Sequence, residues 1–288
     1  MRYLDPKADL TFKKVFGEHK HLVKSLLNAL LPFENPEDEV ESLEYLPVEM
    51  VPDNPLRKNS IVDVRCKDNR GRQFIVEMQM VWSQEFKQRV LFNASKAYVR
   101  QLGHKQQFFF NLQTPQYSLN LSTETLIPES EQFYHYYPTI YNELTNNVIN
   151  NLHLILVELP KFSSHRHEDQ ESRTLWLRYL TEIADYSRKV PQDLLDNCEL
   201  KEAVDLIEES TFSDAELFGH DKFWDIISVE RTLMNSAERR QEEIHKEWVE
   251  KGRKEEKLLI AQSMKSKGYT TEAIAEITGL SPDEIKKL

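Results

Sequence analysis

The sequence contains few of the residues that build several common kinds of functional site. Only two cysteines occur in 288 residues, which argues against a disulfide framework or a cysteine-rich metal site. None of the seven glycines belongs to a Walker or dinucleotide-binding pattern, and no HExxH pattern suggests zinc. No apolar run approaches membrane length, and the charged start is unlike a signal peptide. These absences predict a cytoplasmic protein with no membrane partner.

Charge is distributed unevenly along the chain. The formal net charge of −11 argues against a surface that binds nucleic acid throughout. Residues 53–105 nevertheless contain eleven Lys and Arg but only five Asp and Glu, a local excess of six positive charges. Such a basic island around acidic residues is expected where a protein holds a polyanion at one place, because phosphate contacts supply most nonspecific affinity. The alternative is chance clustering on a solvated helix face.

Residues 60–80 predict a β-hairpin that brings two carboxylates together. Two β-rich runs flank Asp68-Asn-Arg-Gly71, a strong short-range hairpin signal. A three-residue loop ending on a left-handed glycine pairs Asp68 with Arg72, and counting back along both strands places Asp63 opposite Glu77. A loop of four residues would put the two carboxylates on opposite faces.

The two faces of this hairpin differ in character. Arg65 and Gln79 share the face of the two carboxylates, because side chains alternate along a strand. The other face carries an apolar set that predicts contact with the core: Val62, Val64, Cys66, Phe74, Val76 and Met78.

A carboxylate pair of this kind needs compensation. Opposite residues in a sheet lie about 5 Å apart at Cβ, where like charges are destabilising. The repulsion at roughly 4 Å is on the order of 4 kcal/mol at a surface-like effective dielectric. A raised pKa, a neighbouring base such as Arg65, or a bound divalent cation would relieve it. The spacing, the turn and the Glu-x-Gln ending favour a metal site over two solvated charges, since Mg²⁺ prefers oxygen ligands.

The hairpin and two flanking segments resemble a nuclease family. Asp63, followed by Glu77-Met-Gln79 on the next strand, is similar to motifs II and III of the PD-(D/E)XK nuclease superfamily. With residues 9–17 and 158–162, the chain more closely resembles the Rpn family of recombination-promoting nucleases and transposases. The resemblance is closest over residues 1–165.

The resemblance implies metal-assisted phosphodiester hydrolysis. It implies catalytic roles for Asp63, Glu77, Gln79 and Asp9, and a Mg²⁺ ion, or Mn²⁺, held by Asp63, Glu77 and the Met78 carbonyl. The metal would polarise the scissile phosphate and lower the pKa of a bound water. Two departures from the superfamily pattern occur: Val62 stands in place of Pro, at a position that varies widely, and Gln79 stands in place of the usual Lys, as in some active branches. Glutamine can orient a water but supplies no positive charge, so a second metal or a nearby base must compensate. The candidate bases are Lys13, Arg65 and Arg89.

A helix predicted over residues 84–102 places polar side chains along one side. Arg89, Asn93, Lys96 and Arg100 fall within about 40° of each other at 100° per residue. This stripe either follows a phosphate backbone beside the metal site or is an ordinary solvated face. The resemblance favours Arg89, since the family tends to carry an Arg early in this helix. The predicted nucleic-acid-binding residues are Lys13, Arg65, Arg89, Lys96 and Arg100.

Asp9 precedes an apolar helical pattern near the N-terminus. It is either the N-cap of that helix, where Asp is favoured, or an acidic residue that reaches the metal, as the resemblance implies. The two roles are compatible. Lys13, one turn later, is expected to point toward the same region.

The predicted fold class is α/β: a PD-(D/E)XK restriction-endonuclease-like mixed sheet flanked by helices, with an all-helical C-terminal region. Further strands are predicted at 41–51, 117–121 and 152–159, and residues 133–151 are predicted to form a long connection. The predicted domains are a nuclease-like domain over 1–165, a helical extension with a long charged helix over 170–260, and a short helix-turn-helix-like tail over 261–288.

The C-terminal region predicts helices with an assembly role. Residues 238–257 carry seven acidic and seven basic side chains, which indicates a long solvated helix and a homo-oligomer contact. Ser281 and Glu284 form a capping-box pattern at the last helix. Asp283 and Glu284 stand where a DNA-reading helix would have neutral or basic residues, so packing or assembly is favoured over sequence-specific DNA binding.

The sequence thus predicts a Mg²⁺-dependent DNA endonuclease, and the resemblance implies a role in recombination, transposition or defence against foreign DNA. Two alternatives remain open at this point. One is a catalytically inactive, nuclease-derived DNA-binding or assembly protein, which Gln79 and the charged C-terminal helix keep open. The other is an RNA-directed nuclease, since phosphate contacts do not distinguish the sugars.

Overall fold

A computed structural model of the chain describes residues 1–50, 60–81, 85–101, 114–138, 140–141, 144, 148–149, 151–163 and 171–288. These residues form two compact units, Met1–Ser228 and Val229–Leu288, and each has its own hydrophobic core. Three bases of the predicted basic island lie outside the described residues: Arg57, Lys58 and Lys105.

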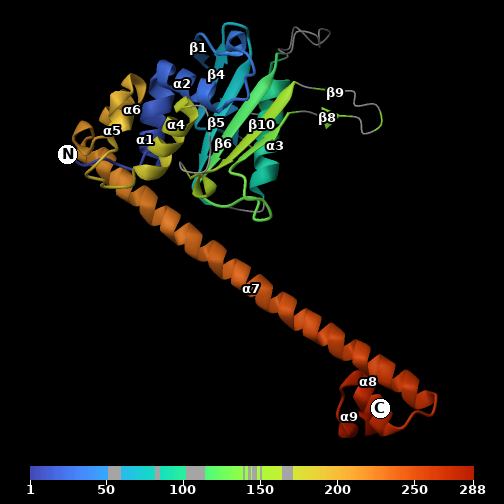
Figure 1. Ribbon diagram of the computed structural model, residues 1–288. Coiled ribbons are helices and arrows are strands. Elements are labelled where there is room, and N and C mark those ends of the chain that lie inside the picture. Colours follow the sequence, from blue (N-terminus) through green and yellow to red (C-terminus); the bar gives the residue numbers. More distant parts are fainter. Residues whose placement is uncertain are drawn as a thin grey trace. The chain divides into compact units, whose positions relative to one another are not determined.

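A six-stranded mixed sheet forms the centre of the first unit (Figure 1). Its strand order is β1-β4-β5-β6-β10-β7. The first three strands of this order pair antiparallel, β5, β6 and β10 run parallel, and β7 is antiparallel to β10. The strands are β1 Leu43–Tyr45, β4 Val64–Asp68, β5 Gln73–Gln79, β6 Gln116–Ser122, β7 Tyr134–Tyr137 and β10 Leu152–Glu158. Two short pairs are separate from this sheet: β2 Glu49–Met50 with β3 Ser60–Ile61, and β8 Ile140–Tyr141 with β9 Val148–Ile149.

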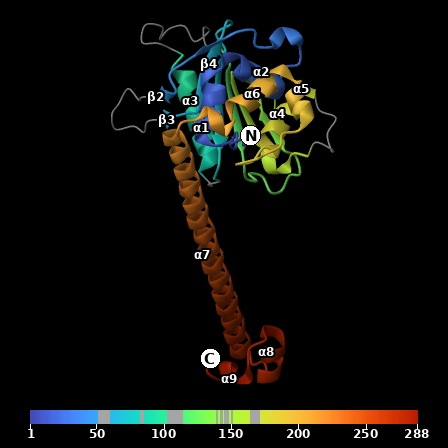
Figure 2. The ribbon, with the colours of Figure 1, turned by 90° about the vertical axis from the view of Figure 1, so that its left-hand side faces the viewer.

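Helices cover both faces of the sheet, and Figures 1 and 2 show α3 on one side and α2, α4 and α6 on the other. The α3 helix spans Phe86–Val99, within the predicted range. The opposite face is covered by α1 Asp9–Phe12, the π-helical turn η1 Lys13–Gly17, α2 Lys20–Leu30, α4 Glu171–Glu182 and α6 Cys198–Leu206. Shorter elements are η2 Pro36–Asp38, η4 Leu159–Lys161, α5 Gln192–Asp196 and η5 Glu209–Thr211. The predicted α/β class with a mixed, helix-flanked sheet is confirmed.

The core follows from the alternation of apolar side chains along the strands. Val64 and Val76 lie in the main core, as predicted, in a cluster that also contains Trp176 of α4. Val62 was predicted on this face but packs with Ile75 on the α3 side. The prediction was wrong because β4 begins only at Val64, so its alternation does not extend back to residue 62.

The hairpin has the predicted turn and register. Val64 lies opposite Val76, and the N–H of Asp68 donates to the Arg72 carbonyl at 3.0 Å. Gly71 adopts a φ of 82°, a left-handed conformation that glycine takes at no steric cost. The Asp68 carboxylate accepts hydrogen bonds from the N–H and the Nε of Arg72 at 2.8 and 2.6 Å. This buried pair fixes the turn and therefore the register of both strands.

Two strand predictions were wrong. The predicted strand at 41–51, of which Val51 lies outside the described residues, consists of the short strands β1 and β2, and the predicted connection at 133–151 contains β7, β8 and β9. The sequence Tyr-His-Tyr-Tyr of β7 lacks an apolar alternation, but its hydroxyls find partners in the fold. Tyr134 donates to the Leu30 carbonyl and Tyr136 pairs with His153 Nδ1, both at 2.8 Å. These long-range contacts stabilise β7 at the sheet edge.

The C-terminal helices are α7 Asp214–Ser266, α8 Thr271–Thr278 and α9 Pro282–Lys286. In the second unit, the apolar core joins the end of α7 to α8 and α9 through Ala261, Ile274 and Ile285. The predicted capping box at Ser281 is confirmed. No helix in the described part of the chain is long and apolar enough to span a membrane.

Candidate active site

Asp63 and Glu77 lie at the same end of the β4–β5 hairpin. Glu77 is on β5, and it is close enough to Asp63 for the charge of Asp63 to raise its pKa. Asp63 immediately precedes β4, and its Oδ2 accepts a hydrogen bond from the Met78 N–H at 2.8 Å. The hairpin therefore brings the two predicted carboxylates together.

Glu77 is an acidic group in a buried position, with 8% of its surface exposed. Burial raises its pKa to about 7, and the charge of Asp63 adds to the rise. A hydrogen bond from Asn93 and the positive charge of Arg89 act in the opposite direction. Like-charge repulsion between the two carboxylates is thus relieved partly by proton uptake and partly by these two side chains.

Asp63 shares this environment. Burial raises its pKa, and the hydrogen bond from the Met78 N–H is the strongest opposing effect. The charge of Asp9 raises the pKa further, whereas Lys13 and Arg89 lower it. The start of the chain, the hairpin and α3 therefore contribute charges to one site.

Asn93 holds the Glu77 carboxylate from α3. Its Nδ2 donates to Glu77 Oε1 at 2.8 Å, and its Oδ1 accepts from the Ser60 hydroxyl at 2.5 Å. Asn93 was predicted to belong to a stripe that either follows a phosphate backbone or is a solvated face, and neither applies to this side chain, which is buried. A signal for this was present, because Val90, Asn93 and Ala97 follow the i, i+3, i+7 spacing of an inward helix face.

Arg89 supplies the positive charge nearest to Gln79. Its guanidinium donates to Gln79 Oε1, and Gln79 Nε2 donates to the Val81 carbonyl. The Arg89 side chain also lies over the ring of Phe86, with 5.6 Å between guanidinium carbon and ring centroid. Of the three predicted compensating bases, Arg89 is the one that bonds to Gln79.

Asp9 and Lys13 form an ion pair at the surface beside Asp63. The α1 helix begins at Asp9, and its N-cap position is Ala8, so the cap prediction was wrong. Asp9 Oδ1 instead lies 2.6 Å from Lys13 Nζ, and both side chains are about half exposed, at 49% and 47%. This exposure leaves the pair accessible to a ligand at the carboxylates.

Arg65, Lys96 and Arg100 form a second group of positive charges. Arg65 is buried and donates to Gln73 Oε1 at 3.0 Å and to the Pro47 carbonyl at 3.4 Å. Burial and the charge of Arg100 lower the pKa of both Arg65 and Lys96. Arg65 is thus directed toward Gln73 and not toward the carboxylates, and it does not compensate them directly.

Other bases of the predicted island are neutralised at the turn end of the hairpin. Lys67, Arg70 and Arg72 each form a salt bridge with an acidic residue. Within the described residues, the positive charge of the island is therefore concentrated on α3 and Arg65.

The donor atoms at this site suit a hard divalent cation. The carboxylates of Asp63 and Glu77 and the Met78 carbonyl are oxygen donors, which Mg²⁺ and Mn²⁺ prefer. Among the residues that the structure describes, no three His, Cys, Asp or Glu side chains are grouped as a metal site. A cation here would therefore take two carboxylates and complete its shell with carbonyl, water or phosphate oxygens, as Mg²⁺ often does.

Comparison with known families settles the relationship of the chain. Residues 6–222 match the sequence model of the PD-(D/E)XK nuclease family transposases. The chain belongs to this family. The matched range takes in all ten residues predicted for the site of this PD-(D/E)XK protein, so the resemblance read from the sequence is confirmed. No curated protein and no solved structure gives a match.

Proposed function

We propose that this PD-(D/E)XK family protein is a metal-dependent DNA endonuclease that hydrolyses phosphodiester bonds at Asp63 and Glu77. The observation that carries the proposal is the pair of neighbouring carboxylates at the end of the hairpin, where buried Glu77 accepts a hydrogen bond from Asn93 and half-buried Asp63 accepts one from the Met78 N–H. Buried like charges are costly for a fold and are retained where a ligand compensates them. Family membership supports a nuclease-like chemistry for the pair.

Each side chain of the site would have a separate role in the reaction. Asp63, Glu77 and the Met78 carbonyl would hold Mg²⁺ or Mn²⁺. A cation bound there supplies charge stabilisation of the phosphate and lowers the pKa of a water. Gln79 would orient the attacking water by a hydrogen bond, and Arg89 would provide the positive charge that glutamine lacks.

The N-terminal pair would extend the site toward the solvent. Asp9 would contribute a further carboxylate near the cation, directly or through water, and Lys13 would contact a phosphate beside the scissile one. Their effect on the pKa of Asp63 supports this placement.

The DNA backbone would follow α3 away from the carboxylates. Arg89 and Arg100 are eleven residues apart, which corresponds to about 16 Å along a helix, or roughly five steps of 3.4 Å along a B-DNA strand. Lys96 lies between them, and Arg65 is close to Arg100. These cations would contact phosphates and contribute affinity without reading the base sequence.

A nuclease-derived DNA-binding protein without catalytic activity is the second candidate. Gln79 favours it, because both ends of its amide are engaged, by Arg89 and by the Val81 carbonyl.

The predicted homo-oligomer through the C-terminal helices stays a prediction; α7 exposes the large apolar side chains of Trp248 and Leu259. A role in recombination, transposition or defence against foreign DNA is proposed from the family alone.

Plasmid cleavage tests the proposal. Supercoiled DNA is incubated with the full chain in Mg²⁺, in Mn²⁺ and in EDTA, alongside Asp63→Asn, Glu77→Gln and a Glu44→Gln control at an exposed acid. Nicking that EDTA and both site variants abolish, and that the control retains, is the expected result. DNA binding without cleavage by any of the proteins would instead establish the second candidate. Cleavage of a structured RNA but not of DNA would assign the RNA-directed alternative.

A further inference from the structure

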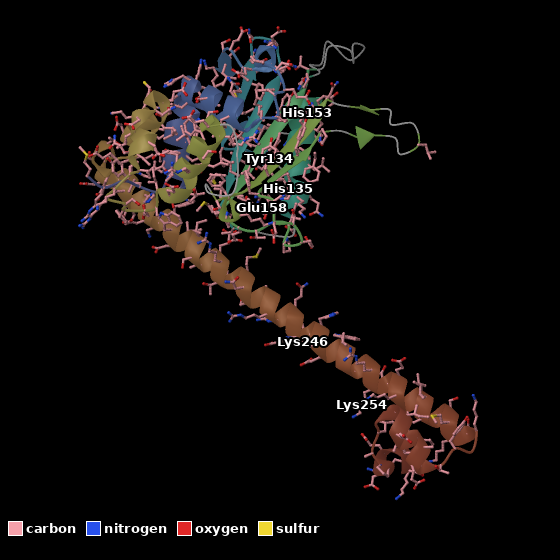
Figure 3. The ribbon with its side chains drawn as sticks, in the orientation of Figure 1. Tyr134, His135, His153, Glu158, Lys246 and Lys254 are labelled. Carbon is pink, nitrogen blue, oxygen red and sulfur yellow. The ribbon has the colours of Figure 1, made fainter. Side chains whose placement is uncertain are left out.

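Glu158 is a fully buried acidic residue that the proposed chemistry does not use. It ends β10, in the same row across the parallel strands as Ser122 of β6 and Gln79 of β5. Neighbouring strands are about 4.8 Å apart, so the Glu158 and Gln79 backbones are roughly 10 Å apart. In Figure 3, Glu158 and His135 lie together near one end of the sheet, whereas His153, near the start of β10, lies toward the other.

Glu158 bonds to two side chains, His135 and Lys161, and we call these three residues the Glu158 cluster. The His135 Nε2 lies 2.8 Å from Glu158 Oε1, and the Lys161 Nζ lies 2.8 Å from Glu158 Oε2. Glu158 Oε2 also accepts the N–H of Leu126 at 2.9 Å. Both carboxylate oxygens are thus engaged, as a buried charge requires.

The same cluster holds a chain segment that is neither helix nor strand. This segment, residues 123–130, connects β6 to β7 and is called the clamp segment below. Lys161 Nζ donates to the carbonyls of Ile127 and Ser130 at 2.6 and 2.7 Å, in addition to its ion pair with Glu158. Three backbone groups of the clamp segment, the Leu126 N–H and the Ile127 and Ser130 carbonyls, therefore hydrogen-bond to only two side chains, Glu158 and Lys161.

The clamp segment also contacts the parts that carry the candidate active site. At its start, the Thr123 N–H donates to the Gln79 carbonyl and the Thr123 hydroxyl to the Met80 carbonyl, both at 3.0 Å. Further along, Leu126 packs with Phe86 and Val90 of α3.

Phe86 and Val90 alternate along α3 with Arg89 and Asn93, the residues that bond to side chains of the candidate active site. Phe86 and Val90 are the helix positions that contact the clamp segment, and Arg89 and Asn93 are three residues after each of them. Arg89 and Asn93 bond to Gln79 and Glu77 respectively, so a shift of the first two turns of α3 would move both hydrogen bonds.

We propose that the Glu158 cluster is a positioning device for the candidate active site. By fixing the clamp segment against the first turns of α3 and the end of β5, it holds Asn93 and Arg89 on the two side chains that they orient. Glu158, His135 and Lys161 are positioning residues and touch neither metal nor DNA. The proposal deepens the proposed function, and only its metal-affinity arm rests on it.

The test compares Lys161→Met with Arg178→Met. Lys161→Met removes the ion pair and both carbonyl contacts at once. Arg178 is the control, because it is a base of similar exposure whose ion pairs, with Glu182 of α4 and Asp193 of α5, lie outside the clamp segment and α3. Lys161→Gln, which keeps an N–H donor, is measured in case the methionine variant does not fold.

Hydrogen exchange gives the first readout and requires no activity. Amide exchange should accelerate in residues 123–130 and also in the first two turns of α3 for the Lys161 variants, and in neither region for Arg178→Met. Faster exchange confined to residues 123–130, or the same pattern in both sets of variants, would overturn the proposal.

Metal affinity gives the second readout. The Kd for Mn²⁺, measured by calorimetry, should rise about tenfold or more in the Lys161 variants, as is typical when the support of a ligand is lost, and stay unchanged in the control. An unchanged Kd in folded Lys161 variants would show that the cluster is only structural. If the wild type bound no Mn²⁺, the proposed function would fail, and the exchange experiment would still decide the positioning role.

Discussion

Replacing Glu77 by glutamine is expected to stabilise the metal-free protein at alkaline pH. The pKa of Glu77 is about 7 in the folded protein, against 4.5 for an ordinary glutamate. The folded state therefore binds this proton more tightly than the unfolded state, so its contribution to stability is fully present below about pH 4.5 and is lost as the pH rises through 7. The difference corresponds to about 3 kcal/mol at pH 8, since each pKa unit is worth about 1.4 kcal/mol.

Urea unfolding at pH 5, 6, 7 and 8 in EDTA measures this effect. The free energy of unfolding of the wild type should fall across the series relative to that of Glu77→Gln, and the variant should be more stable at pH 8 by up to about 3 kcal/mol. Glutamine keeps an oxygen that can accept the Asn93 hydrogen bond, so the comparison isolates the charge. Glu44→Gln, at an exposed acid paired with Lys67, controls for the loss of one negative charge.

A bound divalent cation should reverse the order of stability, so that the wild type becomes more stable than Glu77→Gln. Saturating Mg²⁺ should raise the stability of the wild type, because a ligand that binds only the folded state adds RT ln(1 + [L]/Kd), and it should leave Glu77→Gln nearly unchanged. A variant that is no more stable than the wild type at pH 8, with the same dependence on pH, would refute the description of Glu77 as a buried carboxylate whose charge is only partly compensated.

Three further substitutions are expected to have distinct effects. Asn93→Ala should weaken Mn²⁺ binding about tenfold at pH 7 and move the pH midpoint of binding upward, because the hydrogen bond that lowers the pKa of Glu77 is lost. Calorimetry measures Mn²⁺ binding by this variant and by Gln88→Ala, a control at an exposed position of α3. Equal midpoints in the two variants would count against the role of Asn93 in holding Glu77. Arg89→Met should lower the rate of plasmid nicking by about 10²-fold with the DNA affinity less affected, and Arg89→Lys should restore part of the rate; full activity of Arg89→Met would show that its charge is not used. Arg72→Met should destabilise the first unit by about 3 kcal/mol in urea, because it leaves buried Asp68 unpaired, and a loss below about 1 kcal/mol would contradict this reading.

The hairpin was predictable because its signals are local. The turn sequence selects the loop, the loop length sets the register, and the period of two assigns the faces. The signals for β7 are not local, since its hydroxyl partners, the Leu30 carbonyl and His153, are distant in the sequence. A strand stabilised in this way cannot be read from its own four residues.

The residues of the candidate site were predicted from the resemblance to the family. The partners of their side chains were harder to predict, because packing between distant segments decides them. The coupling of Asp63 with Glu77 was expected from the register. Asn93 was predicted to lie with the basic side chains of α3 because it is close to Arg89 in angle around the helix, whereas its spacing from Val90 favours the buried face. The direction of Arg65 toward Gln73 depends on rotamers and on neighbours from other strands, which no periodicity specifies.

The proposed function requires that Asp63 and Glu77 together hold a divalent cation. The most direct measurement is a Mn²⁺ titration of the full chain by electron paramagnetic resonance, with Asp63→Asn, Glu77→Gln and Glu44→Gln measured alongside. We expect a Mn²⁺ site in the wild type and the control that is lost or weakened at least tenfold in each site variant. Equal Mn²⁺ binding by all four proteins would contradict it.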